Sequence, residues 1–416
     1  MEKSPSHTTV WSKIVGLQLY SSYAADADGR APSLSIIRLL YSMLLFGGYL
    51  VGFYKTVETM LLPVLNPNSP SIFKFALMTQ VGSGVLGSII CYASLWHTDR
   101  MKCVYVEGIR CSNMKINDRY YQFRNMQVPA KQSILVPLSI GLLFILSLWE
   151  GYAHLANYFT IIAIVYPLWM FHVTILEFTT LVKSTECIVT KLNWMMDAFL
   201  ESLQRQSTPI VPIKGEKKAL HKVYPISRRP YVSEHELISG ERLTYMFVIH
   251  ENVAKLAEFI NRAYSLQLIA IVTVTFVNTL FGFFIETKLL FWNYQMVDLI
   301  LRACRYAFEC IPACLLIYNM LVVCASTHTE LFKSASLLHK LLQYKANYFI
   351  DDQALFERSK AIALQLLHRK RFPLFDGSGL FRLDFTFIFS VFSAATSYLI
   401  VLLQFDLSKD LKKAVI

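Results

Sequence analysis

Charged and aromatic residues inside apolar segments are the residues of this chain whose types and spacing could do chemistry. The apolar stretch 297–323 contains Arg302, Arg305 and Glu309, and the last two are one helical turn apart. If the stretch crosses a membrane, these charges are costly and indicate a functional site. Aromatic walls with a few convergent polar groups are typical of a small-molecule pocket. The other residues predicted to line this pocket are Trp149, Glu150, Tyr152, His154, Tyr166, Trp169 and Tyr306.

The alternative for the same residues is structural. Arg305 and Glu309 could form an ion pair, and aromatic side chains are common at the level of lipid headgroups. His172 and Glu177 lie deeper in another apolar stretch. We interpret them as polar contacts between helices.

The last apolar segment has a regular pattern of small, apolar and amide side chains. At helical spacing, Ser397, Val401 and Gln404 share one stripe, and Tyr398, Leu402 and Phe405 share the adjoining one. Such a stripe can line a hydrophobic constriction that blocks ions until it opens. One helix cannot enclose a pore, so this reading requires several copies around an axis. Ordinary packing within a helical bundle is the alternative.

Motifs of soluble enzymes are absent or misplaced. Residues 82–87 fit the GxGxxG dinucleotide fingerprint, but they interrupt an apolar span, and the next acid, Asp99, comes too early for a ribose contact. We expect close helix approach at these small residues instead. The sequence has no HExxH, P-loop or GxSxG motif, and its eight cysteines form no CxxC pair. We therefore predict no enzymatic activity, no cofactor and no metal site.

Composition sets the fold class. Of 416 residues, 54% are hydrophobic and only 17% are charged, and the mean hydropathy is +0.41. A soluble protein has about a quarter charged residues. A membrane-spanning helix needs ~20 mostly apolar residues. Stretches that qualify are 36–54, 75–96, 134–152, 158–182, 266–285, 297–323 and 385–405. The prediction is an all-α polytopic membrane protein with seven transmembrane helices.

Lysine and arginine predict the orientation. The net charge of +11 is concentrated in the segments after spans two, four and six, whereas 151–157 has no lysine or arginine and 286–296 has only Lys288. The positive-inside rule places the amino end in the cytosol and the carboxyl end outside. G-protein-coupled receptors have the opposite topology. The triplet Asp118-Arg119-Tyr120, which spells their DRY motif, lies before span three and is a coincidence.

The cytosolic segments are predicted to be largely helical. Apolar residues recur at helical spacing in 242–262 and 351–371, which indicates helices packed on neighbours. The predicted organisation is a cytosolic segment 1–35, spans one to four with their extensions in 36–206, a flexible linker 207–240, spans five and six with anchor helices in 241–384, a pore-lining helix 385–405 and an extracellular tail 406–416. The pocket is expected in the outer half of the spans.

The final segment resembles a known family. Ser397-Tyr398, five hydrophobic residues and Gln404-Phe405 resemble the TYhhhhhQF signature of insect gustatory receptors, which are related to insect odorant receptors. The family usually has Thr where this chain has Ser397. The resemblance implies a multi-pass plasma-membrane protein that forms a homotetrameric, tastant-gated, non-selective cation channel, alone or with other gustatory receptor subunits. Gln404 and Phe405 would lie at the gate, and Ser397, Tyr398 and Val401 would support the helix or line the pore.

The resemblance also bears on the ligand. Many sugar-receptor relatives have Glu directly after the Tyr of the signature, and here that residue is Leu399. This favours a bitter or plant-derived compound. The alternatives are a fructose-type sugar receptor channel and a G-protein-coupled chemoreceptor, which the predicted topology disfavours. A transporter would show an internal repeat or paired broken helices, and neither is found.

Overall fold

The computed structural model describes most of the chain in seven continuous stretches. These are residues 35–58, 71–119, 134–153, 158–207, 240–290, 296–345 and 375–415, together with Leu17, Glu357, Lys360, Ala361 and Leu364. Within these residues the structure is helical apart from one short loop, 375–384, which holds an isolated β-bridge.

Seven long helices make up the described fold. They are α2 (Ile36–Thr56), α4 (Ser71–Arg119), α5 (Leu135–Ala153), α6 (Tyr158–Ser207), α7 (Gly240–Leu290), α8 (Met296–Lys345) and α10 (Phe385–Val415). Each predicted span falls largely within one of these helices, so the all-helical prediction is confirmed, with six or seven membrane-spanning candidates. Six helices have apolar stretches long enough to cross a membrane, and α5 contributes a shorter one, Val136–Trp149.

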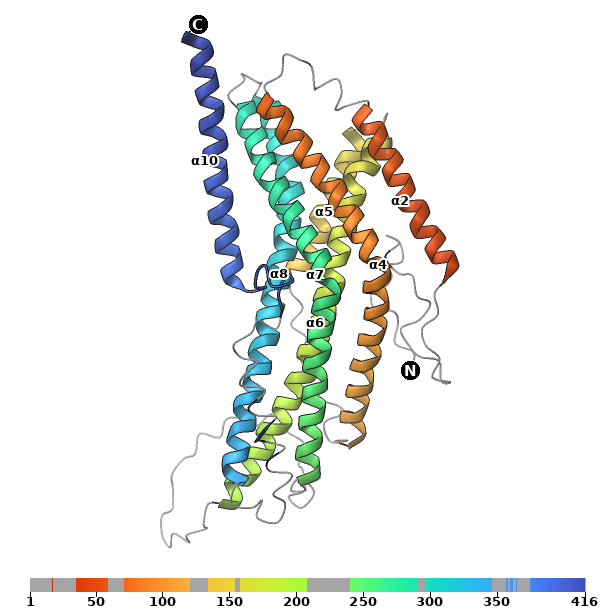
Figure 1. The fold of residues 1–416 in the computed structure, drawn as a ribbon, viewed down its shortest axis with the longest axis vertical. Coiled ribbons are helices and arrows are strands. Elements are labelled where there is room, and N and C mark those ends of the chain that lie inside the picture. Colours follow the sequence, from red (N-terminus) through yellow and green to blue (C-terminus); the bar gives the residue numbers. More distant parts are fainter. Residues whose placement is uncertain are drawn as a thin grey trace.

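The helices divide the molecule into two levels. Figure 1 shows α4, α6, α7 and α8 running through both levels, whereas α2, α5 and α10 occupy only the upper one. Each of the four long helices has 49 to 51 residues. A 50-residue helix is about 75 Å long, against about 30 Å for the hydrocarbon core of a bilayer. The lower level is therefore a bundle of helical extensions beyond the bilayer.

Two groups of buried residues hold these levels together. The larger spans α4, α6, α7 and α8 and includes Phe178, Tyr264 and Leu316. The second fills the lower bundle with side chains such as Leu192, Phe247 and Leu338. The stripe predicted in 242–262 is confirmed, because Met246, Ile249, Val253 and Ile260 are buried and Leu256 packs beside them. Apolar side chains thus continue the four long helices into the lower bundle.

Two glycines allow close helix contact. A Cβ on Gly87 would lie 2.6 Å from Val274 Cγ2 on α7, and one on Gly108 would lie 2.8 Å from Leu256 Cδ2. Gly82 and Gly84 have open space at the same position. The expectation that small residues in 82–87 serve helix approach is confirmed for Gly87 and wrong for Gly84, where an added Cβ would meet no described atom within 4 Å. All six residues lie inside α4, where no strand precedes them.

Some sequence predictions fall mainly outside the described residues. The linker 207–240 is described only at its two ends, and in 351–371 only four residues are described, all helical. The predicted tail 406–416 is helical over most of its length. Helix α10 runs to Val415, because no Gly or Pro interrupts the sequence after Phe405.

A compact turn joins the bundle to α10. Asp376 and Arg382 form the β-bridge, and Ser378 and Gly379 take positive φ angles of 49° and 78°. The buried side chains of Phe375 and Leu383 fix the two ends of the turn in the main core. We call residues 375–384 the connecting loop.

Candidate functional site

The last helix, α10, packs on its own chain along a single stripe. Leu399, Leu402 and Leu403 contact a small cluster built around Phe281 and Phe284 of α7 and Ala76 of α4. The ring of Tyr398 meets that of Phe276 edge-on, with centroids 6.5 Å apart. Leu402, predicted on the stripe next to the pore, therefore points into the bundle.

The residues predicted to line a pore lie on the opposite face of α10. At about 100° per residue, Ser397, Val401 and Gln404 are turned away from the stripe that contacts α7. All three are exposed in the single chain, and Val401 retains 44% of its accessible surface. Ser397 Oγ donates to the carbonyl oxygen of Ser393 at 2.9 Å. This face therefore carries one apolar side chain, that of Val401, between two polar side chains that water can solvate.

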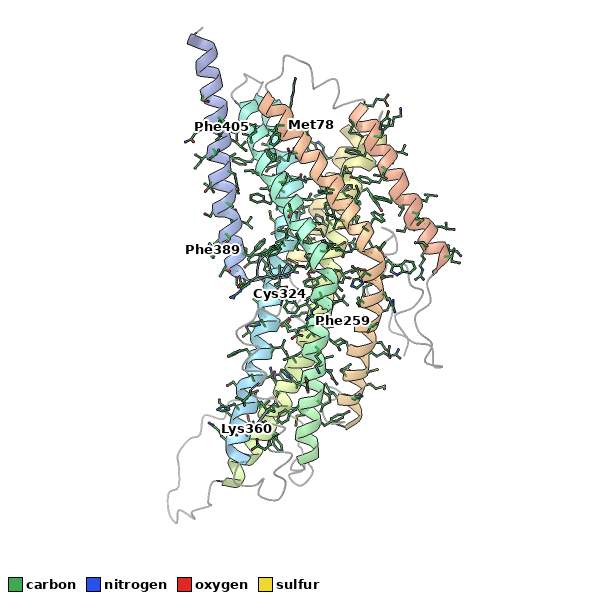
Figure 2. All side chains as sticks on the ribbon, in the orientation of Figure 1. Met78, Phe259, Cys324, Lys360, Phe389 and Phe405 are labelled. Atoms are coloured by element: carbon green, nitrogen blue, oxygen red, sulfur yellow. The ribbon has the colours of Figure 1, made fainter. Side chains whose placement is uncertain are left out.

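The flanks of α10 carry large apolar side chains that nothing in the described chain covers. Phe389 is 75% exposed, Phe392 67% and Phe405 62%. Figure 2 labels Phe389 and Phe405 on this helix, which stands beside the other helices rather than among them. None of the residues in the apolar stretch Phe385–Phe405 is buried. The helix thus offers surface for lipid or for further protein chains.

The connecting loop holds the lower end of α10 to the bundle. Asn261 of α7 forms two hydrogen bonds with Asp376: its Nδ2 donates to Asp376 Oδ1 at 2.9 Å, and its Oδ1 accepts from the Asp376 amide at 3.2 Å. Phe381 stacks on Phe387 in the first turn of α10, with centroids 4.6 Å apart. Asp384 Oδ1 accepts from the Thr386 amide at 2.9 Å, as an N-cap residue does. Movement of α7 at Asn261 is thereby linked to the start of α10.

Apart from His154, the predicted pocket residues lie on three helices that pack against one another, α5, α6 and α8. Trp169 Nε1 of α6 donates to Ser147 Oγ of α5 at 2.9 Å, which fixes the α5–α6 contact at this level. The hydroxyl of Tyr166 is hydrogen-bonded to that of Tyr92. Tyr306 donates to the carbonyl oxygen of Thr279 on α7. Tyr306 therefore faces α7, with its ring against Gly282.

The remaining pocket predictions are only partly described. Trp149 is half-buried on α5. His154 lies outside the described residues. The helix positions of a further group are known, but their side chains are outside the description: Glu150, Tyr152, Arg302, Arg305 and Glu309.

An aromatic cluster missed at the sequence level extends this region to α2 and α4. The rings of Phe46 and Tyr92 lie 4.4 Å apart, and those of Tyr49 and Tyr166 lie 5.9 Å apart. Phe46 and Tyr49 have the i, i+3 spacing that places side chains on one helix face. That spacing is the signal that could have predicted the cluster. Tyr166 is the one predicted pocket residue within it.

Glu177 and His172, the two polar residues deeper in α6, make different kinds of contact. Glu177 Oε1 lies 3.2 Å from Lys102 Nζ on α4, which confirms the expected contact between helices. His172 does not make one: its Nδ1 lies 2.7 Å from the carbonyl oxygen of Leu168, one turn earlier in the same helix. A buried ring that faces mainly apolar neighbours satisfies one nitrogen locally in this way.

A family model matches almost the whole chain. The model described as 7tm chemosensory receptor aligns with residues 9–409.

Three proteins of Drosophila melanogaster are similar over parts of their length. The chain is 33% identical to gustatory and pheromone receptor 33a over 177 residues, which are 42% of this chain and 37% of that protein. It is 30% identical to putative gustatory receptor 28a over 224 residues, 51% of this chain and 48% of that one. The chain is 25% identical to gustatory receptor for bitter taste 66a over 185 residues, which are 42% of this chain and 32% of that protein. The chain thus spans less than half the length of each relative.

The fold as a whole is similar to a solved structure. The insect olfactory receptor OR5 from Machilis hrabei superposes with a TM-score of 0.59 over 95% of this chain and 96% of that one, at 12% identity. The same receptor in complex with eugenol gives a TM-score of 0.60 at 13% identity, with the same coverage. At this identity the similarity concerns the arrangement of the helices.

Proposed function

Because this chain belongs to the 7tm chemosensory receptor family, we propose that it is a gustatory receptor that binds a small-molecule tastant and itself forms the cation channel that the tastant opens. The observation that carries the proposal is the exposed polar face of α10. Ser397 and Gln404 are turned away from the bundle on a helix whose other surfaces are apolar. Polar side chains in a membrane favour a water-filled cavity over lipid. A pore shared with other copies supplies that water.

Val401 supplies the closed gate in this proposal. It lies one turn from Ser397 on the same face, so symmetry-related copies bring several valines to one level around an axis. A ring of apolar side chains stops ions by excluding water from the pore. A small rotation of each helix moves this ring out of the pore and brings polar groups into its place. Gln404 and Phe405 follow on the outer side and complete the gate.

Assembly follows from the uncovered flanks of α10. A cyclic assembly buries the same patch on every copy. It would place Phe389, Phe392 and Phe405 between neighbouring subunits or against lipid. Four copies is the number implied by the resemblance to gustatory receptors.

We place the tastant site in the upper level among α5, α6 and α8. Trp149, Tyr166 and Trp169 supply aromatic walls there, and the helices carrying Glu150, Arg302, Arg305 and Glu309 supply polar groups. The ligand class that we favour is a bitter or plant-derived compound. Similarity to a relative named for bitter taste supports this choice. Leu399, the position that is acidic in many sugar receptors, packs against α7 instead of lining the pore face.

Channel function is tested by recording currents from cells that express only this chain. Alkaloids, plant glycosides and sugars are applied with G-protein signalling blocked. We expect one bitter or plant-derived compound to evoke a non-selective cation current. A response that disappears when G-protein signalling is blocked would contradict the proposal.

The pore face is tested by cysteine accessibility. With tastant present, a charged thiol reagent should change the current of Val401→Cys and leave Leu402→Cys unchanged, because Leu402 packs in the bundle. The unmodified chain has eight free cysteines and serves as the baseline. Equal modification of both variants would show that α10 does not present the Val401 face to a pore.

A further inference from the structure

Two prolines lie inside long helices of the upper level, Pro167 in α6 and Pro312 in α8. Neither proline belongs to the first turn of its helix. A proline nitrogen carries no hydrogen, so it cannot bond the carbonyl oxygen four residues earlier in the helix. The carbonyl groups that lose this helical bond are those of Ala163 and Phe308. Each helix is therefore weakened at its proline.

Polar contacts fix the register between these two helices below the prolines. Asn193 Nδ2 of α6 donates to Glu330 Oε2 of α8 at 2.8 Å, and the two residues are 137 positions apart in the sequence. Ser326 Oγ of α8 donates to Glu186 Oε1 of α6 at 2.8 Å, across 140 positions. The separation is nearly constant, so α6 and α8 run side by side in the same direction, as Figure 1 also shows.

This register places the two prolines at nearly the same level. A separation of 140 positions sets Pro167 beside position 307 of α8, which lies a few residues before Pro312. At a rise of about 1.5 Å per residue, the two prolines are roughly 8 Å apart along the helix axes. The weak points of two neighbouring helices therefore coincide.

The packing of both helices also changes at the prolines. Pro167 is buried, and so is every residue in 170–179. Pro312 is the first buried residue of α8 among those whose exposure is described. Above the prolines, no side chain whose exposure is described is buried in 158–166 or 296–311, which we call the upper segments. Few buried contacts are typical of the parts of a protein that move.

The upper segment of α8 contacts α7. The hydroxyl of Tyr306 donates to the carbonyl oxygen of Thr279, and its ring lies against Gly282. Thr279 Oγ1 also donates to Cys310 Sγ at 3.9 Å. Phe281, in the same part of α7, belongs to the cluster on which α10 packs. A movement of this segment would therefore reach α7 beside its contact with α10.

We propose that Pro167 and Pro312 form a paired hinge, about which the upper segments tilt together against the buried lower parts of α6 and α8. What drives the tilt rests on the proposed function, because Tyr166, Arg302 and Glu309 of the predicted tastant site lie on the upper segments. A ligand shifts a conformational equilibrium when it binds one arrangement more tightly than the other. Hinged closure around a ligand is a common form of such a change.

Hydrogen–deuterium exchange on the purified full-length protein tests the hinge without any tastant. Pro312→Ala supplies the amide that can bond the Phe308 carbonyl, so amides in 296–311 should exchange several-fold more slowly than in the unmodified protein. The matched control is Pro137→Ala. Pro137 is exposed and lies in the first turn of α5, where no helical bond is lost, so exchange should not change.

Tastant-evoked current tests the movement. With the compound that opens the unmodified channel, Pro167→Ala and Pro312→Ala should each raise the concentration for half-maximal current about three- to tenfold, since a restored helical hydrogen bond opposes the tilt. Pro137→Ala should leave this concentration unchanged. Surface expression should stay normal in all three variants, because alanine is the residue that most favours a helix.

Three results would overturn the hinge. One is unchanged exchange of the amides in 296–311 when Pro312 is replaced by alanine. Another is an unchanged half-maximal concentration in both hinge variants of a chain that conducts. The third is an equal effect of Pro137→Ala in either measurement. A chain that gives no current with any compound would contradict the proposed function, and the exchange measurement would still decide whether the hinge exists.

Discussion

Single glycines set the distances between helices in the upper level. Gly87 brings α4 against Val274 of α7 and Phe171 of α6, and Gly282 accommodates the ring of Tyr306 from α8. A run of glycines in an apolar segment predicts close approach but does not say which glycine makes the contact. That depends on the rotation of α4, which is set by residues of α6 and α7 far away in the sequence.

Gly87→Ala should destabilise the receptor. The added methyl group would lie 2.6 Å from Val274 Cγ2 and 3.1 Å from Phe171 Cζ, so the helices must shift. Overpacking of this kind costs about 1–3 kcal/mol. We expect a lower melting temperature and less protein at the cell surface. Gly84→Ala is the matched control: it has open space and should leave both quantities unchanged or slightly raised.

In the Lys102–Glu177 pair, the sequence predicts that Glu177 needs a partner but not which residue that partner is. Glu177 could be expected to contact another helix because a lone charge in an apolar segment needs a partner. The identity of that partner could not be predicted, since Lys102 lies 75 positions earlier in a segment that also looks like an exposed basic loop.

Lys102→Met should be among the most destabilising substitutions in the chain. It would leave the carboxylates of Asp99 and Glu177 buried without their shared ammonium group. Removing one partner of a buried ion pair costs about 3–5 kcal/mol. Thermal unfolding and surface expression measure the effect. Lys183→Met, in a pair whose lysine is 31% exposed, should cost far less. Similar losses in both variants would mean that the burial of Lys102 and its carboxylate partners is not what makes the substitution costly.

At the scale of elements, hydropathy and periodicity predict the helices well. In lipid, a stretch of ~20 apolar residues forms a helix because its backbone groups then bond one another. The apolar stripe in 242–262 correctly predicts that α7 continues as a helix below its membrane span. The connecting loop could not be predicted in the same way. Its shape depends on Asn261, Ser265 and Phe178, which lie more than 100 positions from it.

Asn261→Ala should weaken the link between the bundle and α10. It removes both hydrogen bonds to Asp376 and leaves polar groups of the loop without partners, which costs about 1–3 kcal/mol. If the loop transmits movement of α7 to α10, the tastant concentration for half-maximal current should rise several-fold while surface expression stays normal. Asn193→Ala is a control of the same residue type, because Asn193 bonds Glu330 and Ser334 in the lower bundle.

At the scale of the whole molecule, the described residues leave most of the apolar surface of α10 uncovered. The exposed flanks of α10 could not be predicted from composition, because α10 is apolar on most of its faces and the sequence does not say which face meets α7. Helical spacing alone predicts that Ser397, Val401 and Gln404 share one exposed face of α10, and that this face lines a pore stays a prediction. If α10 lines a shared pore, the number of copies around its axis is a property of the assembly, which a single chain does not define.

The direction of the chain across the membrane is a further property of the whole molecule. Figure 1 shows the carboxyl end of α10 at the top and the far ends of the four long helices at the bottom. Lysines adjoin core residues of the lower bundle in the sequence: Lys191 precedes Leu192 and Lys340 precedes Leu341, whereas the segment 151–157 has no lysine or arginine. Basic segments are retained in the cytosol. The lower bundle should therefore be cytosolic.

Epitope tags on the two ends measure this orientation. Antibodies should reach a tag after Ile416 on intact cells and a tag before Met1 only after permeabilisation. A tag inserted in 207–240 should behave like the amino-terminal one, since the ends of α6 and α7 that flank this segment lie in the lower bundle. If the carboxyl-terminal tag were detected only after permeabilisation, the basic segments would face outward. The gate residues Gln404 and Phe405 would then lie on the cytosolic side, and a tastant in the external medium would have to act on what is now the lower bundle.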